Sequence, residues 1–301
     1  MGAGRRLCDD GPVSETTSEL PPDTEAGPAI NHVQLAALAA VLAGVLAAGC
    51  YLGTVGAAVA VGVLQLVLIP CWVLGHRLPG RIGGLLLGAL AAVAADLLTL
   101  HWPDNGYSPV VAVLALAIPA MFVHQLTRGV VRARVMESLA GVTVLVIAVV
   151  APAGLIVLRD GLDGRTVTLT LLAALGLGMV AASLTDAVLP APRFDPAIDR
   201  GLPAVLVGVL VGGLVGYLGL HRQIDFASGR AAFAGAAVAA VACLLSIGAS
   251  FAERRSPEPS AEVAVPVSGS RLAALRPAAS VALTIGLTVP AAYVLATALT
   301  S

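Results

Sequence analysis

The chain has 301 residues, of which 58% are hydrophobic and only 12% charged, and it carries a net charge of -1. Soluble domains carry roughly 25% charged residues, so a water-soluble fold of this length could not cover so much apolar surface with polar groups. The balanced charge also argues against nucleic acid as a partner, because no basic excess is present to neutralise phosphates. The composition therefore predicts an integral membrane protein.

The first 31 residues differ in composition from the rest of the chain. They hold six acidic residues, two arginines and several Pro, Ser and Thr residues, which is typical of a segment that cannot form a packed core. No basic stretch leads directly into an apolar run, as it would in a signal peptide. We predict two regions: an acidic, disordered cytoplasmic tail over residues 1–31 and a transmembrane helical domain over residues 32–301.

From Val33 onward, long apolar runs alternate with short charged or Gly/Pro-rich breaks. About 20 residues of α-helix cross the roughly 30 Å of bilayer hydrocarbon, and the runs lack the period-2 alternation of a membrane β-barrel. We therefore predict an all-α transmembrane bundle of about nine helices, whose first two members form a tight hairpin. The predicted spans are 33–52, 55–75, 82–101, 109–126, 138–158, 166–189, 202–220, 230–252 and 275–298.

The arginines predict the orientation of this bundle. All 17 Lys/Arg positions are Arg, which together with the abundance of Ala, Val, Leu and Gly indicates a GC-rich bacterial gene. With nine helices, thirteen arginines fall on the side of the N-terminal tail and four on the other side. Arginine-rich loops stay in the cytoplasm. We therefore predict a multi-pass protein of the bacterial cytoplasmic membrane, with its N-terminus in the cytoplasm and its C-terminus outside.

Small residues at four-residue spacing mark two predicted helices as close-packing surfaces. Gly208, Gly212 and Gly216 fall in the seventh span, and Gly84 and Gly88 in the third. Such spacing lets helix backbones approach closely in lipid. We favour helix packing over a substrate-lining role, and these faces could also bind a membrane-protein partner or a second copy of the chain. Prolines inside four spans are expected to kink them: Pro70, Pro119, Pro152 and Pro290.

Three ionisable residues fall at membrane depth, where such groups are the default functional candidates. Asp96 lies near the end of the third span, His124 near the end of the fourth and Asp186 near the end of the sixth. All three are close to a predicted interface, so for Asp96 and His124 we favour a hydrated helix-end residue over a functional one. For Asp186 both interpretations stay open.

The loop after Asp186 and the last cytoplasmic loop gather charged residues at one end of the bundle. Arginine is suited to bidentate phosphate binding, but cytoplasmic arginines also follow the topology rule and contact anionic headgroups, which we favour here. No Walker loop, HExxH, GxSxG or Rossmann motif appears, so the sequence predicts no cofactor. The candidate polar cluster comprises Asp186, Arg193, Asp195, Asp199, Arg200, Glu253, Arg254, Arg255 and Arg276.

Three stretches of the second half share the layout of a known enzyme family. They read RVMESLAGVTVLVIAVVAPAGLIVLRD, SLTDAVLPAPRFDPAIDRGLPAVLVGVLVGGLVG, and SIGASFAERRS followed by SGSRLAALRPAASVALTIGLTVPAAYVL. Their order resembles that of the phosphatidate cytidylyltransferase (CDP-diacylglycerol synthase) family over roughly residues 135–298. The resemblance implies a membrane enzyme with a cytoplasm-facing, metal-dependent site that joins CTP to phosphatidate.

The chain departs from the motifs of that family at most acidic positions. Asp186 matches the Asp of the family's Asp-Thr segment, but the Gly-Asp pair falls on Gly248 and Ala249. A cage for divalent cations needs several carboxylate or carbonyl oxygens, and one matched Asp cannot form it. We therefore predict a catalytically degenerate relative, not an active enzyme, that binds anionic lipid or a membrane partner.

Two alternatives stay open. An active cytidylyltransferase would need Mg²⁺ held by relocated ligands such as Asp195, Asp199 and Glu253, all within about 6–8 Å of Asp186. A transporter or permease would instead need a polar cavity near mid-membrane and broken helices.

Overall fold

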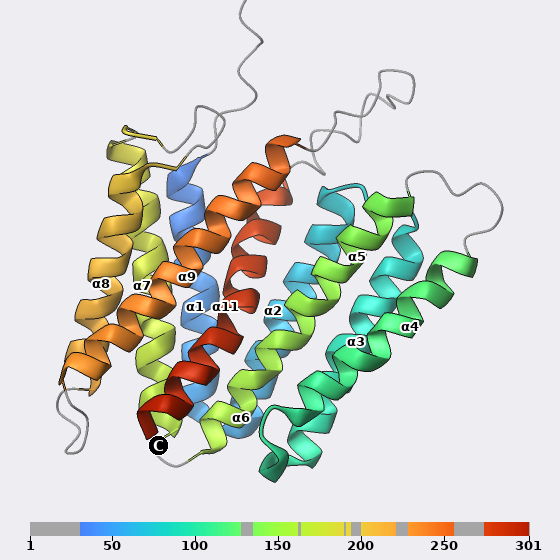
Figure 1. Cartoon of the computed structure of the whole chain (residues 1–301), viewed down its shortest axis with the longest axis horizontal. Helices are drawn as coiled ribbons and strands as arrows, with labels where there is room; N and C mark the ends of the chain where they lie inside the picture. Colours follow the sequence, from blue (N-terminus) through green and yellow to red (C-terminus); the bar gives the residue numbers. More distant parts are fainter. Residues whose placement is uncertain are drawn as a thin grey trace, which may run out of the picture. The chain divides into compact units, whose positions relative to one another are not determined.

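The computed structural model describes residues 31–127, 135–161, 164–189, 191–193, 200–220, 228–255 and 274–300 (Figure 1). The predicted acidic tail, Asp195 and Asp199 lie outside this part of the chain. For Glu253, Arg254 and Arg255 the structure describes the helical backbone but not the side chains.

Helices long enough to cross a bilayer make up almost all of the described chain. The helices are α1 (His32–Leu52), α2 (Thr54–Gly75), α3 (Arg81–His101), α4 (Ser108–Thr127), α5 (Val135–Val150), α6 (Gly154–Asp160), α7 (Gly164–Val188), α8 (Leu202–Leu220), α9 (Ser228–Arg255) and α11 (Arg276–Thr300). Short 3-10 turns, η1 (Pro103–Asn105) and η2 (Ala151–Ala153), precede α4 and α6. Over these ranges there are nine membrane-length apolar helices, with Val135–Asp160 counting as one span. The predicted all-α bundle is confirmed, and the chain is a multi-pass membrane protein.

The predicted hairpin between the first two helices is present. A single residue, Gly53, separates α1 from α2, and its φ of 118° lies in a region that L side chains rarely adopt. Glycine has no Cβ to clash there, so the chain can reverse within one residue. The division between the first two spans follows from this glycine.

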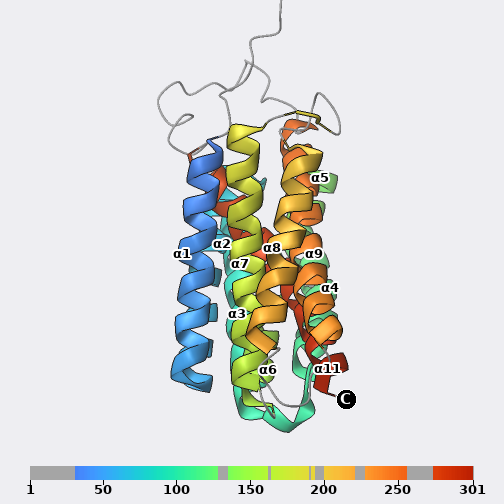
Figure 2. The ribbon, with the colours of Figure 1, turned by 90° about the vertical axis from the view of Figure 1, so that its left-hand side faces the viewer.

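Two groups of helices meet along α11. On one side, α7 packs against α1 and α8, and α8 packs against α9; on the other, α3 packs against α2, α4 and α5. Helix α11 contacts α9 and α2 and so lies between the two groups (Figure 1). Helix α1 begins at one end of the bundle and α11 finishes at the other (Figure 2).

The fifth span is interrupted in its interior. Helix α5 stops at Val150, the 3-10 turn η2 follows, and α6 completes the crossing. Pro152 lies in η2; it has no N–H to donate to the carbonyl of Ala148, four residues earlier, and its ring disfavours a continuous helix. Pro152, which is expected to kink its span, lies at a 3-10 interruption of it. Pro70, Pro119 and Pro290 instead lie inside the helices α2, α4 and α11.

The glycines of α8 serve close packing inside the bundle. A Cβ placed on Gly208 would lie 2.9 Å from Cys243 Sγ of α9, and one on Gly212 would lie 2.7 Å from the carbonyl oxygen of Gly235. A Cβ on Gly216 would overlap the carbonyl oxygen of Ala231. The predicted packing role of these glycines is confirmed within the chain. Association with another copy stays a prediction, and it would need a different face of α8.

The opposite face of α8 carries large apolar side chains at the same four-residue spacing. These side chains are exposed: Leu206, Leu210, Leu214 and Leu218. A helix with glycines on the inner face and leucines on the outer face suits lipid as its surroundings, because lipid tails provide no hydrophobic drive for helix association. The packing of α8 therefore depends on backbone contact with α7 and α9.

Two glycine substitutions test this packing. We expect Gly216→Ala to lower the free energy of unfolding by about 1–3 kcal/mol, because the added methyl meets main-chain atoms of α9 that cannot move aside. Gly62→Ala in α2 is the matched control: no atom lies within 4 Å of its Cβ position, so the change is expected to be neutral or to stabilise the helix by about 0.5–1 kcal/mol. Thermal unfolding of both variants in one detergent measures the difference. Equal melting temperatures would contradict the packing assignment.

Reporter fusions test the topology. Because α1 begins at one end of the bundle and α11 finishes at the other, a fluorescent reporter that folds in the cytoplasm is expected to work at the N-terminus only. A periplasmic phosphatase is expected to work at the C-terminus only, as the arginine bias predicts. The same reporter active at both ends would be incompatible with nine crossings.

Candidate functional site

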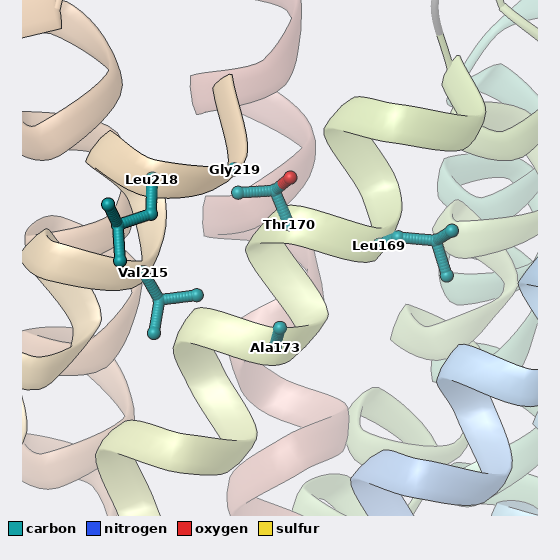
Figure 3. Close-up of a pocket in the computed structure, with 6 residues that line it drawn as sticks. All are labelled: Leu169, Thr170, Ala173, Val215, Leu218 and Gly219. Carbon is teal, nitrogen blue, oxygen red and sulfur yellow. The ribbon is translucent and has the colours of Figure 1, made fainter. Parts of the chain in front are cut away.

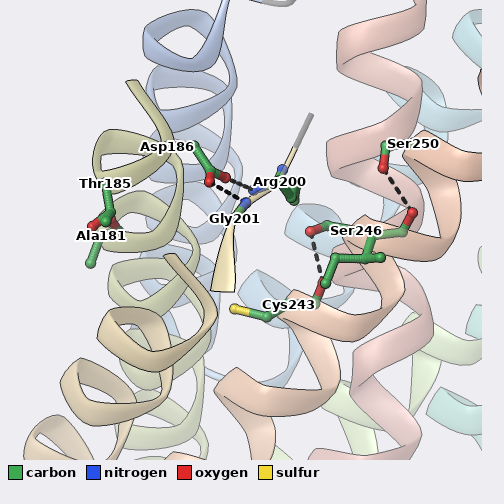
Figure 4. A network of polar contacts seen from close by, with 9 residues as sticks. Ala181, Thr185, Asp186, Arg200, Gly201, Cys243, Ser246 and Ser250 are labelled. Atoms are coloured by element: carbon green, nitrogen blue, oxygen red, sulfur yellow. Dashed lines mark hydrogen bonds and ion pairs between the residues drawn. The ribbon is translucent and has the colours of Figure 1, made fainter. Parts of the chain in front are cut away.

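The first polar centre lies where α7 ends and α8 begins. Asp186, in the last turn of α7, is buried, and its Oδ1 accepts a hydrogen bond of 2.8 Å from the backbone N–H of Gly201. Its Oδ2 accepts one from Arg200 Nη1 at 3.3 Å, forming a buried ion pair (Figure 4). The guanidinium offsets the unfavourable position of a carboxylate at the negative end of a helix. Asp186 therefore fixes the connection between two helices.

Further polar groups near this pair are satisfied by their own helices. Ser246 and Ser250 of α9 donate to the carbonyls of Cys243 and Ile247, at 3.0 and 2.8 Å (Figure 4). Thr185, next to Asp186, donates to Ala181 at 2.7 Å. Each of these hydroxyls therefore uses its only O–H donor on its own helix. The hydroxyls around the Asp186–Arg200 pair are thus satisfied within the helices that carry them.

The remaining residues of the predicted cytoplasmic cluster are placed separately. Arg193 is exposed, and its backbone pairs with that of Gly201 in an isolated bridge. Arg276, at the start of α11, donates its Nε to the carbonyl oxygen of Gly75 at the end of α2, at 3.1 Å. The structure thus brings Asp186 together with Arg200, whereas the Arg276 side chain contacts the end of α2. Asp195 and Asp199, together with the side chains of Glu253, Arg254 and Arg255, lie outside what the structure describes.

Two other arginines make the same kind of contact as Arg276. Arg159 donates its Nε to the carbonyl oxygen of Cys50 in the last turn of α1, at 2.6 Å, and Arg230 donates to Ala298 near the end of α11. The last carbonyls of a helix have no partner within it and carry partial negative charge. Each arginine therefore satisfies the C-terminal end of a different helix.

The aromatic residues beside Arg276 anchor the end of α2. The rings of Trp72 and His76 lie 4.2 Å apart, and Trp72 Nε1 donates to the carbonyl of Gly141 in α5 at 2.9 Å. Burial lowers the pKa of His76; the Arg276 cation lowers it further, although the hydrogen bond to the Trp72 carbonyl opposes both. His76 is therefore neutral near pH 7 and adds no charge to this end of the bundle.

The second polar centre lies inside the membrane, between α2, α3 and α5. Gln65 is only 4% exposed and lies near the middle of α2. Its Nε2 donates to Asp96 Oδ1 of α3 at 3.1 Å and to the carbonyl oxygen of Val149, next to the end of α5, at 2.9 Å. Asp96 is thus not a lone helix-end carboxylate, because it contacts a buried amide in the interior of the bundle.

The break between α5 and α6 is held by a tyrosine from the segment before α4. The hydroxyl of Tyr107 donates to the carbonyl oxygen of Ala151 at 3.2 Å, and its ring lies against Gly154 and 4.9 Å from the ring of Tyr293. Burial raises the pKa of Tyr107, so the phenol stays a donor. Gln65 and Tyr107 together satisfy two carbonyls at the interruption.

Two more polar side chains of this half lie at helix contacts; Thr99 is buried and His124 is half-buried. Thr99 lies one turn after Asp96 on α3; it is 1% exposed, and its hydroxyl has no hydrogen-bond partner. His124, which the sequence singled out, packs its ring against Gly83 of α3, where a Cβ would overlap it. His124 therefore contributes to the contact between α3 and α4.

The sequence analysis did not identify Gln65, Thr99 or Tyr107. Gln65 gives a local signal, because it is the only amide in a long apolar run, and Pro152 marks a helix break at mid-span. Nothing in the sequence shows that these two features face each other. Their proximity depends on how α2, α3 and α5 pack.

The described part of the chain also forms an open groove between α7 and α8 (Figure 3). It encloses about 380 Å³ and is lined by Leu169, Thr170, Ala173, Val215, Leu218 and Gly219. Thr170 supplies its one polar side chain, and this side chain packs against Gly219. With no charged or metal-ligating lining residue, the groove has no groups for catalysis.

Comparisons with known protein families, with characterised proteins and with solved structures give no match to this chain. Among the residues that the structure describes, no group of three or more His, Cys, Asp or Glu side chains is arranged to hold a metal ion. The site therefore has to be interpreted from its own geometry.

Removing one member of the buried ion pair tests the role of Asp186. We expect Asp186→Ala to lower the free energy of unfolding by about 3–5 kcal/mol, because it leaves the Arg200 guanidinium buried without a counter-charge. Asp104→Ala, at an exposed position in η1, is the control. The double variant Asp186→Ala/Arg200→Ala is expected to lose less than the sum of the single losses, since the two residues interact directly. Additive losses in thermal unfolding would show that the pair does not act as a unit.

Proposed function

We propose that this chain is a membrane protein without nucleotidyl-transfer activity, which keeps the layout of the cytidylyltransferase family and binds anionic phospholipid headgroups. The headgroup site that we propose is the turn between α2 and α3 together with the start of α11. We call it the α2–α3 arginine surface; it consists of Arg77, Arg81 and Arg276.

The observation that carries the binding proposal is an uncapped helix start surrounded by cations. Helix α3 begins at Arg81 after Gly80, and no side chain caps its first N–H groups. A helix N-terminus favours anions through its free N–H groups and its dipole. Arg81 is exposed there, Arg77 precedes it in the same turn, and Arg276 is held nearby through Gly75. No acidic residue occurs between positions 72 and 84 to oppose a phosphate.

The engagement of Asp186 supports the absence of nucleotidyl transfer. Asp186 is the one acid that matches the family motif, and both of its oxygens accept hydrogen bonds from Arg200 and Gly201. A divalent cation would have to displace the guanidinium and would still need further oxygen ligands. An active enzyme with Mg²⁺ on Asp195, Asp199 and Glu253 is the alternative, and it depends on side chains outside the described part of the chain.

One observation favours a second candidate function, solute transport. Discontinuous helices with polar groups at mid-membrane are a feature of transporters, and the interruption at Ala151–Ala153 lies beside Gln65 and Asp96. The described chain contributes one such interruption. We keep headgroup binding first because its cationic surface is exposed, whereas the polar centre inside the membrane is closed around Gln65.

An assay for CDP-diacylglycerol tests the first part of the proposal. Purified protein in detergent with CTP, phosphatidate and Mg²⁺ is expected to form no product above a protein-free control. Formation of CDP-diacylglycerol that disappears in Asp186→Asn would establish the enzyme alternative instead.

Lipid retention tests the second part. We expect Arg77→Gln/Arg81→Gln to reduce the retained ratio of phosphatidylglycerol to phosphatidylcholine roughly thirtyfold, since each of the two arginines near an anionic surface contributes about 1 kcal/mol. The matched control is Arg165→Gln at the opposite end of the bundle, where Arg165 stacks on Tyr51. Mass spectrometry of the co-purified lipids measures the ratio. A ratio that is the same in all three proteins would rule out this surface as the headgroup site.

A further inference from the structure

We infer that the polar centre inside the membrane binds one monovalent metal cation, held by the carboxylate of Asp96, the hydroxyl of Thr99 and the main-chain carbonyl of Val149. This site is separate from the α2–α3 arginine surface. It rests on three observations about the described residues: the local charge, the oxygens that lack donors, and the position of the helix break.

The first observation is an excess of negative charge at this place. Asp96 contributes a carboxylate five residues before the end of α3 at His101, which is about 7 Å along the helix axis. The carbonyl oxygen of Val149, in the last turn of α5, lies nearby and carries partial negative charge. The contact between Gln65 and both Asp96 and Val149 places the two negative features within reach of one side chain.

No arginine of the surrounding helices balances that charge. In α2, α3, α5 and α6, which the structure describes fully, the arginines are Arg81 and Arg159, and each lies at a helix end. Arg81 is fifteen residues from Asp96 on α3, or about 22 Å along the axis. Arg159 donates to Cys50 in α1. A carboxylate at membrane depth needs a cation, a proton or several donors, and here the donor is the amide of Gln65.

The second observation is a set of oxygens suited to a small hard cation. Thr99 lies on the same side of α3 as Asp96 because residues three apart are neighbours on a helix. Its hydroxyl is buried without a hydrogen-bond partner, although buried polar groups are normally paired. A cation beside Asp96 would supply the missing interaction. One carboxylate together with neutral oxygens matches a single positive charge, whereas divalent cations require more carboxylates.

The third observation is the break itself. Pro152 leaves the carbonyl of Ala148 without its helical N–H partner, and Gly286 of α11 lies against that oxygen, where no side chain could fit. Gln65 donates to the next carbonyl, that of Val149. Interrupted helices in membranes use such carbonyls as cation ligands. Of these two carbonyls, that of Val149 lies beside Asp96, because the amide of Gln65 donates to both.

Thermal unfolding of the purified full chain in detergent tests the site. The protein is compared in NaCl, KCl and choline chloride at equal ionic strength and one pH. A ligand that binds only the folded state raises the melting temperature in a saturable way, so we expect a saturable rise in at least one metal salt relative to choline. Equal melting temperatures in the three salts would overturn the inference.

Three variants connect the effect to the named groups. Asp96→Asn is expected to abolish the difference between metal salt and choline, whereas Asp104→Asn, exposed in η1, is expected to keep it. Thr99→Val removes the hydroxyl at nearly constant volume and is expected to raise the half-saturating cation concentration about tenfold, as the loss of a ligand to a charged group implies. Thr99→Ser is expected to restore it.

Each remaining outcome decides the question. If Asp96→Asn still shows the full salt effect, the cation binds elsewhere and the inference is wrong. If the melting temperature depends on pH through Asp96 but not on the metal salt, the site takes a proton and the inference is also wrong. Should Asp96→Asn fail to fold, the two Thr99 variants decide alone, and an unchanged half-saturating concentration in Thr99→Val would overturn the site.

Discussion

In a bilayer, every main-chain carbonyl that a helix leaves unpaired has to find a donor within the protein, because hydrocarbon offers none. In the described part of this chain, side chains from neighbouring helices meet much of that requirement. Arg159, Arg276 and Arg230 donate to the last turns of α1, α2 and α11. At the interrupted span, Gln65 and Tyr107 donate to Val149 and Ala151. Many of the scarce polar residues thus donate to main-chain carbonyls at helix ends and at the interrupted span.

This constraint also separates the two polar centres. At the α7–α8 connection, the carboxylate of Asp186 pairs with an arginine and a backbone N–H. Its charge is therefore balanced within the chain, and the contacts hold the two helices together. Between α2, α3 and α5, negative charge meets an amide, and a neighbouring hydroxyl remains without a partner. A balanced centre serves stability, whereas an unbalanced one is suited to binding.

The helical spans could be predicted from the sequence because their signal is local. A run such as 202–220 is apolar throughout and ends at charged residues, and the structure gives α8 the same limits. The hairpin at Gly53 and the interruption at Pro152 also follow from local chemistry. Contacts between distant residues could not be predicted in this way. Gln65 and Asp96 are 31 positions apart, and their pairing depends on which faces of α2 and α3 meet.

For the same reason, sequence reasoning treated Asp186 and Arg276 as parts of one charged cluster. Hydropathy assigns both residues to helix ends on the same predicted side of the membrane, and it cannot predict whether they lie close together. The structure separates them: Asp186 pairs with Arg200, and Arg276 caps α2. Two residues on the same side of the membrane therefore do not necessarily belong to one site.

The glycine contacts of α8 restrict how this bundle can deform. Where Gly208 and Gly212 let main chains touch α7 and α9, no flexible side chains lie between the helices to absorb a rotation. Helices α7, α8 and α9 therefore behave as one block. Any change of shape has to come from sliding along the larger side chains that line α2, α3 and α11, or from bending at the interruption between α5 and α6.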